Sequence, residues 1–345
     1  MKKNKNWING MDSLRFVLAL IVLLSHLDNP FVKVFNNSET NVGKYAAAIL
    51  ANSFNGIGAV IAFFIISGFV VHYPVKDTEL NIRKFLIRRW VRIGIPLVII
   101  SSVAIYYDQF VLIPIWSLYC ELIYYTIYPI LRKIQLSLVV KCQMAYLLQI
   151  TIVILFCQND ILSLIYQKDV NYFGTYWQLG DFMTWIIGLP IWLLGVLIAE
   201  KIDVLSEKIK DITFKELSIY RISIFTLGVI LHVLKFHFFL SDIIILNVFA
   251  LLMVKWIERE IVFYKTHKSI EILEFGGQFS YSLYLCHGLC VLFLSYFMEI
   301  NIYTYFIYIL LSVLVSYGVF LIIEKPSHKL AQNLANIKLR HKTTA

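Results

Sequence analysis

The sequence contains few charged residues and few cysteines. Only 15% of its 345 residues are charged, whereas 59% are hydrophobic, and the mean hydropathy is +0.73. A soluble domain of this size could not bury so much apolar surface, so the composition favours a membrane protein with several spans. The cysteines lie in apolar segments without C-x-x-C spacing, which argues against a disulfide framework or a zinc site. They are Cys120, Cys142, Cys157, Cys286 and Cys290.

Several motifs with known chemistry are also missing. The sequence has no G-x-S-x-G, G-x-x-x-x-G-K-[ST] or H-E-x-x-H, so serine hydrolase, P-loop and zincin chemistry lack support, and we expect no metal site. The net charge of +9 comes without a zinc-finger spacing or a basic arm, so we expect no nucleic-acid partner. No small-residue cleavage site closes the first apolar stretch, which therefore predicts a retained helix and not a signal peptide.

Long apolar segments recur about ten times along the chain. A bilayer core needs roughly 20 residues per helix, and fewer where the helix ends snorkel. The sequence therefore predicts an all-α polytopic membrane protein with about ten transmembrane helices. The predicted spans are 11–29, 53–73, 92–108, 113–131, 142–158, 182–200, 219–240, 242–257, 279–298 and 303–324.

The distribution of lysine and arginine predicts the orientation. With ten spans and a cytoplasmic N-terminus, 26 of the 31 Lys and Arg residues fall on the cytoplasmic side, as the positive-inside rule requires. Both termini are then cytoplasmic. No repeat or linker marks a second domain, so we expect one membrane domain over 1–345, with a helical core at about 8–326 and a basic cytoplasmic tail at 327–345. The outer segments 30–52 and 159–181 are long enough for a substrate rim.

Ionisable residues inside the predicted spans are functional candidates, because they are costly in a bilayer. Arg15 and His26 are eleven residues apart, which places them on one helix face about 16 Å apart along the axis. This spacing favours a shared interior cavity over two independent structural roles. Glu121 and His287 are expected at a depth similar to that of His26, where the three could form an acid–base group. The alternative for each histidine is a hydrogen bond to a neighbouring helix.

Arginines cluster in the cytoplasmic segment that precedes the third span. Arg88, Arg89 and Arg92 are spaced to share a helical face in part, and guanidinium groups bind phosphates bidentately. They are therefore candidates for a phosphate clamp, and contact with lipid headgroups is the alternative. His232, Lys235 and His237 do not have the spacing of a metal site, and headgroup contact is the favoured interpretation.

Six sequence stretches follow one another in a recognisable order. They are "GMDSLRFVLALIVLLSH" (10–26), "FFIISGFVV" (63–71), "FLIRRWVRIGIP" (85–96), "WSLYCELIYYTIYPIL" (116–131), "FSYSLYLCHG" (279–288) and "IIEKP" (322–326). Together they resemble the acyltransferase 3 family of integral membrane acyltransferases. The chain departs from the family pattern at Leu122, where a second acidic residue is common, and at Cys286, where tryptophan is usual. It also has Gly288–Leu289 where proline is frequent.

The resemblance implies transfer of an acyl group, usually acetyl, from cytoplasmic acyl-CoA to a hydroxyl of a cell-surface or lipid-linked glycan. It implies that Arg89 and Arg92, with Arg88 beside them, bind the CoA phosphates, and that His26 acts as general base or carries the acyl group. Glu121 would orient His26, and Arg15 would line the donor path or polarise the thioester. His287, Ser117 and Trp116 are further candidates from the matching motifs.

The resemblance also bears on the setting of the protein. Many relatives carry a C-terminal extracytoplasmic hydrolase-like domain, and none is expected here. We expect a multi-pass protein of the bacterial inner membrane, with acyl-CoA as donor substrate, no permanently bound cofactor, and possible partner proteins of glycan assembly. The alternatives are an exporter or flippase for polysaccharide or lipid-linked sugar, in which the polar residues line a path without acyl transfer, and a membrane scaffold or sensor without chemistry.

Overall fold

The computed structural model describes residues 8–38, 40–109, 114–166, 174–209 and 212–337, and all regular structure in these ranges is helical. The prediction of an all-α protein is confirmed. Lys2, Lys3, Lys5, Lys168 and Lys210, which entered the charge count, lie outside the described residues, as does the end of the basic tail.

The helices follow the predicted order of spans, with short helices between them. They are α1 (Met11–Ser25), α2 (Pro30–Asn36), α3 (Asn41–Ala51), α4 (Gly56–His72), α5 (Ile82–Tyr106), α6 (Ile115–Lys133), α7 (Leu138–Phe156), α8 (Gln158–Tyr166), α9 (Gly180–Lys208), α10 (Phe214–Phe238), α11 (Asp242–Thr266), α12 (Glu271–Gly277), α13 (Ser280–Ser295), α14 (Ile302–Val319) and α15 (Lys325–Asn336), with a 3₁₀ turn at Tyr73–Val75 and a π turn at Phe320–Glu324.

Six helical segments among the described residues are long and apolar enough to cross a membrane. The number rises to eight if two bent pairs each count as one span: α1 with α2, bent by 55°, and α12 with α13, bent by 71°. The helices α6 and α11 match the other two predicted spans in position but are not among these eight. The structure therefore supports a multi-pass membrane protein, and the count of ten and the orientation of the termini stay predictions.

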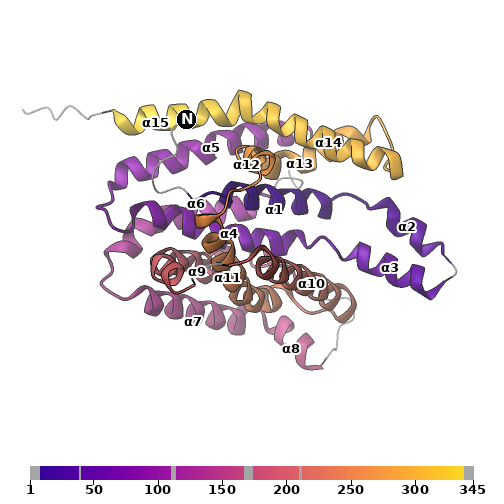
Figure 1. The fold of residues 1–345 in the computed structure, drawn as a ribbon, viewed down its shortest axis with the longest axis horizontal. Helices are drawn as coiled ribbons and strands as arrows, with labels where there is room; N and C mark the ends of the chain where they lie inside the picture. Colours follow the sequence, from indigo (N-terminus) through magenta and orange to yellow (C-terminus); the bar gives the residue numbers. More distant parts are fainter. Residues whose placement is uncertain (1–7, 39, 110–113, 167–173, 210–211, 338–345) are drawn as a thin grey trace, which may run out of the picture.

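The helices lie mostly along the long axis of the molecule (Figure 1). α4 and α9 pack against each other more extensively than any other pair, α1 lies against α4, and α15 lies along α5. The α4–α9 contact depends on two glycines, because a Cβ atom on Gly195 would lie 1.8 Å from the Ile65 backbone oxygen and one on Gly68 would lie 2.0 Å from the Trp192 oxygen. Small residues at such crossings let two membrane helices approach closely.

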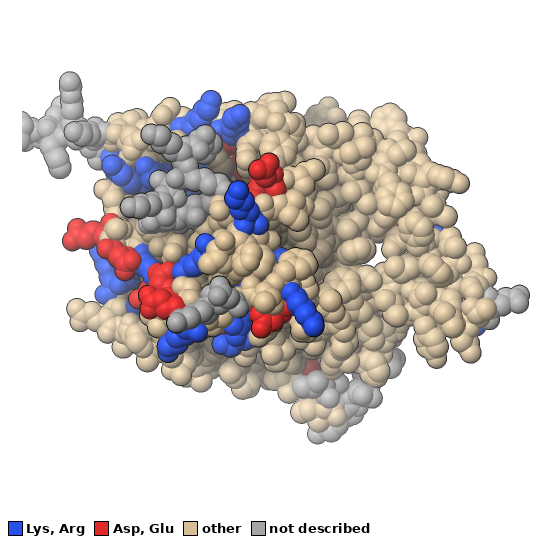
Figure 2. Space-filling view, in the orientation of Figure 1, with Lys and Arg blue, Asp and Glu red and all other residues tan. Residues whose placement is uncertain are grey.

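Charged residues gather at one end of the helix bundle. Figure 2 shows Lys, Arg, Asp and Glu at the left of this face, whereas most of the right side is uncharged. Asp203 near the end of α9 pairs there with Lys76 and, at 2.7 Å, with Lys265. We call this the basic end. It agrees with the charge asymmetry that predicts a cytoplasmic side.

Replacing Gly195 by valine is expected to destabilise the protein by about 2 kcal/mol, the usual cost of overpacking a tight contact. Gly318→Val is the matched control, because a Cβ atom on Gly318 in α14 has no neighbour within 4 Å. Thermal unfolding of both purified variants in one detergent measures the difference. Equal melting temperatures would show that the α4–α9 contact does not limit stability.

Candidate functional site

A cavity of about 280 Å³ lies inside the bundle and is lined by three arginines. Arg15 comes from α1, and Arg89 and Arg92 come from α5. Glu121 of α6 and Tyr281 of α13 are among its other polar residues. We call it the arginine cavity. Three guanidinium groups facing one carboxylate leave it with an excess of positive charge.

The local sequence of α5 explains which arginines enter this cavity. The Asn81 side chain caps the helix by accepting a hydrogen bond from the Lys84 backbone N–H. Arg89 and Arg92 are three residues apart and therefore share one face. Arg88 lies about 100° around the helix from Arg89; it is exposed and does not line the cavity. The structure thus separates Arg88 from the other two members of the predicted clamp.

The guanidinium groups of the cavity are poorly neutralised. Arg15 has a long ion pair of 3.6 Å with Asp12. Arg89 lies over the Tyr125 ring, 5.3 Å from its centroid, a cation–π contact that adds no negative charge. Neither Arg89 nor Arg92 has an ion-pair partner within 4 Å in the described ranges. Such a cluster is suited to a polyanion such as a phosphate ester, because arginine binds phosphate oxygens bidentately.

Glu121 belongs to the wall of the arginine cavity. It accepts a hydrogen bond of 2.6 Å from the Ser67 hydroxyl of α4 and a second one from Tyr125. Trp192 of α9 donates to the same Ser67 oxygen at 3.3 Å. The carboxylate is therefore held by α4 and α6 and fixes the tyrosine on which Arg89 stacks.

A second, larger cavity of about 660 Å³ is lined by three histidines, two of which lie side by side. The rings of His26, at the end of α1, and His287, in α13, lie 4.9 Å apart between centroids. Trp116 of α6 also lines this cavity and stacks on Trp177, with centroids 5.5 Å apart. We call it the histidine cavity.

Hydrogen bonds to backbone carbonyls orient both imidazoles. Nδ1 of His26 lies 2.9 Å from the Val22 carbonyl oxygen, and Nδ1 of His287 lies 2.7 Å from that of Tyr284. Because a carbonyl can only accept, each Nδ1 carries the proton, and Nε2 of each neutral ring keeps its lone pair. His26 is exposed to the cavity whereas His287 is buried, so Nε2 of His26 is the more accessible base.

The two cavities adjoin each other. Val60 and Tyr284 line both of them. The Tyr284 hydroxyl is hydrogen bonded to Ser117 at 2.6 Å, and its ring contacts Phe63 at 5.6 Å between centroids. Trp116 and Ser117 are consecutive residues at the start of α6, yet Trp116 lines the histidine cavity and Ser117 the arginine cavity. Tyr284 and Ser117 therefore form the partition between the two cavities.

Two expectations about these residues need correction. Arg15 and His26 do not share one cavity but line two adjoining ones, and Glu121 is not beside His26. The predicted span continued to residue 29, whereas α1 ends at Ser25, so His26 lies at the C-terminal end of α1 and lines the same cavity as Trp116 at the start of α6. Glu121 lies five residues past Trp116, which is about 7.5 Å deeper and 140° around the helix. That rotation turns Glu121 toward the arginines.

The sequence interpretation gave no site role to three residues near these cavities. It assigned His232 and Lys235 to headgroup contact, whereas both line the histidine cavity, where Lys235 pairs with Asp242. Glu324 is fully buried in the π turn and accepts a 2.6 Å hydrogen bond from Ser282, within electrostatic range of Arg92 and Arg15. The "IIEKP" stretch marked Glu324, but only the fold shows which residues it faces. No group of three or more His, Cys, Asp or Glu in the described ranges is arranged to hold a metal ion.

The comparisons with known proteins agree with the motifs. Residues 8–322 match the family model described as an acyltransferase domain, that of the acyltransferase 3 family. Neither the comparison with curated proteins nor that with solved structures returns a match. The family match covers nearly all of the helical bundle and both cavities, and on this basis the chain belongs to the acyltransferase 3 family of membrane acyltransferases.

Proposed function

We propose that the protein transfers an acyl group, most simply acetyl, from acyl-CoA to a hydroxyl of a cell-surface or lipid-linked glycan. The observation that carries this proposal is the contact between the two cavities at Tyr284. It brings a cluster suited to phosphates next to a pair of imidazoles with free Nε2 lone pairs.

The donor would bind in the arginine cavity. The phosphates of acyl-CoA carry several negative charges, and the guanidinium groups of Arg89 and Arg92 have no ion-pair partner within 4 Å among the described residues. The charge distribution predicts that the donor comes from the basic end. The pantetheine arm would extend past Arg15 toward the partition, so that the thioester reaches Tyr284 and Ser117.

The chemistry would take place in the histidine cavity. Nε2 of His26 accepts the proton of the acceptor hydroxyl, the oxygen attacks the thioester carbonyl, and the C–S bond breaks. The proton then passes from His26 to the departing CoA sulfur. An alternative course has His26 attack the thioester first and carry the acyl group to the acceptor. In both courses His287 packs against His26 and fixes the position of its ring.

The other candidates would support these steps. Glu121, with Ser67 and Tyr125, would hold the wall on which Arg89 stacks and is a positioning residue. Ser117 would control passage between the cavities through its bond to Tyr284, and Trp116 would offer an aromatic face to the acceptor. The proposed setting is the inner membrane of a bacterium, together with proteins of glycan assembly.

The His26→Ala variant is expected to lose acyl transfer by about a hundredfold or more, the contribution of a positioned general base. Transfer of labelled acetyl from acetyl-CoA to glycan, by purified protein in vesicles, measures this loss. His237→Ala is the matched control, because His237 is exposed and lines neither cavity. An unchanged rate in His26→Ala would contradict the proposed role. A native protein that moves glycan without acylating it would favour the exporter.

The Arg92→Gln variant is expected to raise the KM for acyl-CoA roughly tenfold, because it loses a charge-assisted hydrogen bond to phosphate. Arg88→Gln on the same helix is the control and should leave KM unchanged, since Arg88 does not line the cavity. Added pyrophosphate should compete with acyl-CoA in the control and more weakly in Arg92→Gln. An equal KM in the two variants would show that phosphate does not bind in the arginine cavity.

A further inference from the structure

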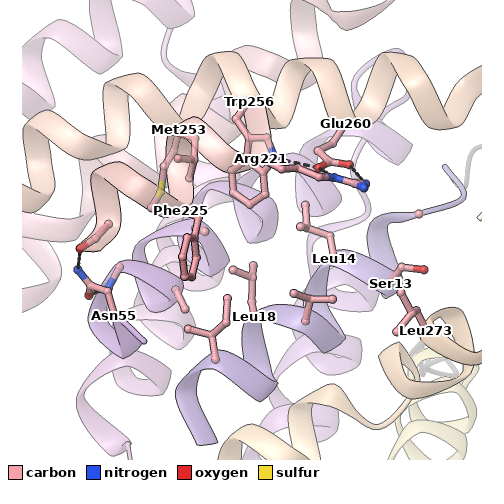
Figure 3. Close-up of a pocket in the computed structure, with 18 of the residues that line it drawn as sticks. Ser13, Leu14, Leu18, Asn55, Arg221, Phe225, Met253, Trp256, Glu260 and Leu273 are labelled. Atoms are coloured by element: carbon pink, nitrogen blue, oxygen red, sulfur yellow. Dashed lines mark hydrogen bonds and ion pairs between the residues drawn. The ribbon is translucent and has the colours of Figure 1, made fainter. Parts of the chain in front are cut away.

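A third cavity of about 340 Å³ lies between α1, α4, α10 and α11 (Figure 3). Its walls are mainly apolar, and Leu14 and Leu18 of α1 face Phe225 of α10 and Met253 of α11 across it. Asn55 lies at one end, and Arg221 with Glu260 lies at the other (Figure 3). We call it the lateral pocket.

The lateral pocket opens on the outside of the bundle. Val17, Phe225 and Ile270 line it and are 37%, 49% and 60% exposed. Val17 and Phe225 lie within predicted membrane spans, so their part of the mouth faces hydrocarbon, whereas Ile270 lies between two predicted spans. α10 closes the pocket with few contacts, since only 11% of its apolar window is buried inside the protein. An apolar chain could therefore enter from the bilayer without crossing water.

The charged end of the pocket is already satisfied. Arg221 donates to both oxygens of Glu260 at 2.7 and 2.8 Å, and Trp256 donates to the same carboxylate at 2.8 Å. Glu260 is only 1% exposed. This ion pair satisfies Glu260 from within the protein, and the walls between it and Asn55 are apolar. The orientation of a ligand therefore depends on which end of the pocket leads to the reactive groups.

The Asn55 end leads to the histidine cavity. Asn55 lines both cavities. The α1 face that lines the lateral pocket through Leu14, Leu18 and Ile21 continues at the same helical spacing to Ser25, which lines the histidine cavity beside His26. A molecule with its chain in the lateral pocket would thus hold its polar end near the reactive imidazole.

We propose that the lateral pocket binds the hydrocarbon chain of a lipid-linked acceptor, whose sugar hydroxyl lies in the histidine cavity. This inference rests on the proposed function and selects a lipid-linked acceptor over a free polysaccharide. The hydrocarbon chain of the acceptor enters from the bilayer, and its sugar lies beside His26. The acyl donor reaches the sugar from the arginine cavity, on the other side of Tyr284.

Gly228 offers a way to fill the pocket without disturbing its walls. A Cβ atom on this α10 residue would meet its nearest neighbour, the Phe249 ring, only at 3.9 Å. Leucine also favours a helix over glycine, so Gly228→Leu should fold. Gly318→Leu is the matched control, because it places the same side chain on α14 with no neighbour within 4 Å and away from all three cavities.

The test uses photolabelling of the purified full-length protein in lipid nanodiscs. One probe is a hexadecyl glycoside with a diazirine at the end of its chain, and a second carries the diazirine on the sugar. The chain probe should label α1, α10 and α11, and the sugar probe should label the peptides that contain His26 and His287. Gly228→Leu should reduce chain labelling roughly tenfold, and Gly318→Leu should not.

Two results would overturn the inference. One is chain labelling that is equal in the two leucine variants. The other is labelling of the same residues, with equal efficiency, by a phosphatidylcholine with the diazirine at its chain end, because the pocket would then hold bulk lipid.

Acyl transfer to the hexadecyl glycoside and to the methyl glycoside, measured in the same samples, separates the two proposals. If the native protein is labelled as expected but acylates neither glycoside, the pocket assignment stands and the proposed function fails. If Gly228→Leu acylates the hexadecyl glycoside as fast as the native protein does, the inference fails and the proposed function stands.

Discussion

A charged side chain inside a bilayer must face other protein groups or a water-filled cavity, and this constraint organises the structure. Arg15, Arg89 and Arg92 come from two helices that are distant in sequence, and they converge on one interior cavity. A lone guanidinium facing lipid would cost several kcal/mol. Their convergence instead concentrates positive charge, which an anionic ligand would stabilise. The helices α1, α4, α5, α6 and α13 supply the walls that make this possible.

The same helices build the second cavity from neighbouring residues. Trp116 and Ser117 face different cavities because consecutive residues on a helix point about 100° apart. Tyr284 lines both cavities. Its carbonyl oxygen accepts a hydrogen bond from His287, and its hydroxyl is hydrogen bonded to Ser117. One tyrosine thus connects the orientation of the imidazole pair with the partition in front of it. This arrangement supports a donor and an acceptor that meet between two compartments.

The residue types and the family could be predicted from the sequence. Arginine and histidine inside apolar segments are rare enough to indicate function, and the pairing of His26 with His287 agrees with the expected depth of both residues. The position of Glu121 could not be predicted, because it depends on where α1 ends and on which side of α6 faces the arginines. An apolar stretch of sequence does not show at which residue its helix ends or which of its faces meets a neighbouring helix.

The number of spans and the lateral pocket show a further limit of the sequence. The bends of 55° and 71° fall at Pro30, which begins α2, and after Gly276 and Gly277, which end α12; these residues indicate a break in a helix but not its angle. The lateral pocket exists because α10 packs loosely, with Gly228 facing Asn55. The sequence of α10 would be equally hydrophobic whether the helix packed tightly or left a space beside it. Only the three-dimensional arrangement therefore reveals the pocket.

Transfer across a sealed membrane tests the central claim most directly. The protein is reconstituted in vesicles, labelled acetyl-CoA is supplied on one face only, and acyl ester is measured on glycan that is present only on the other face. The two adjoining cavities predict acylation when the donor is on the side of the basic end and the glycan is on the opposite side. Acylation only when donor and glycan share one side would contradict the account.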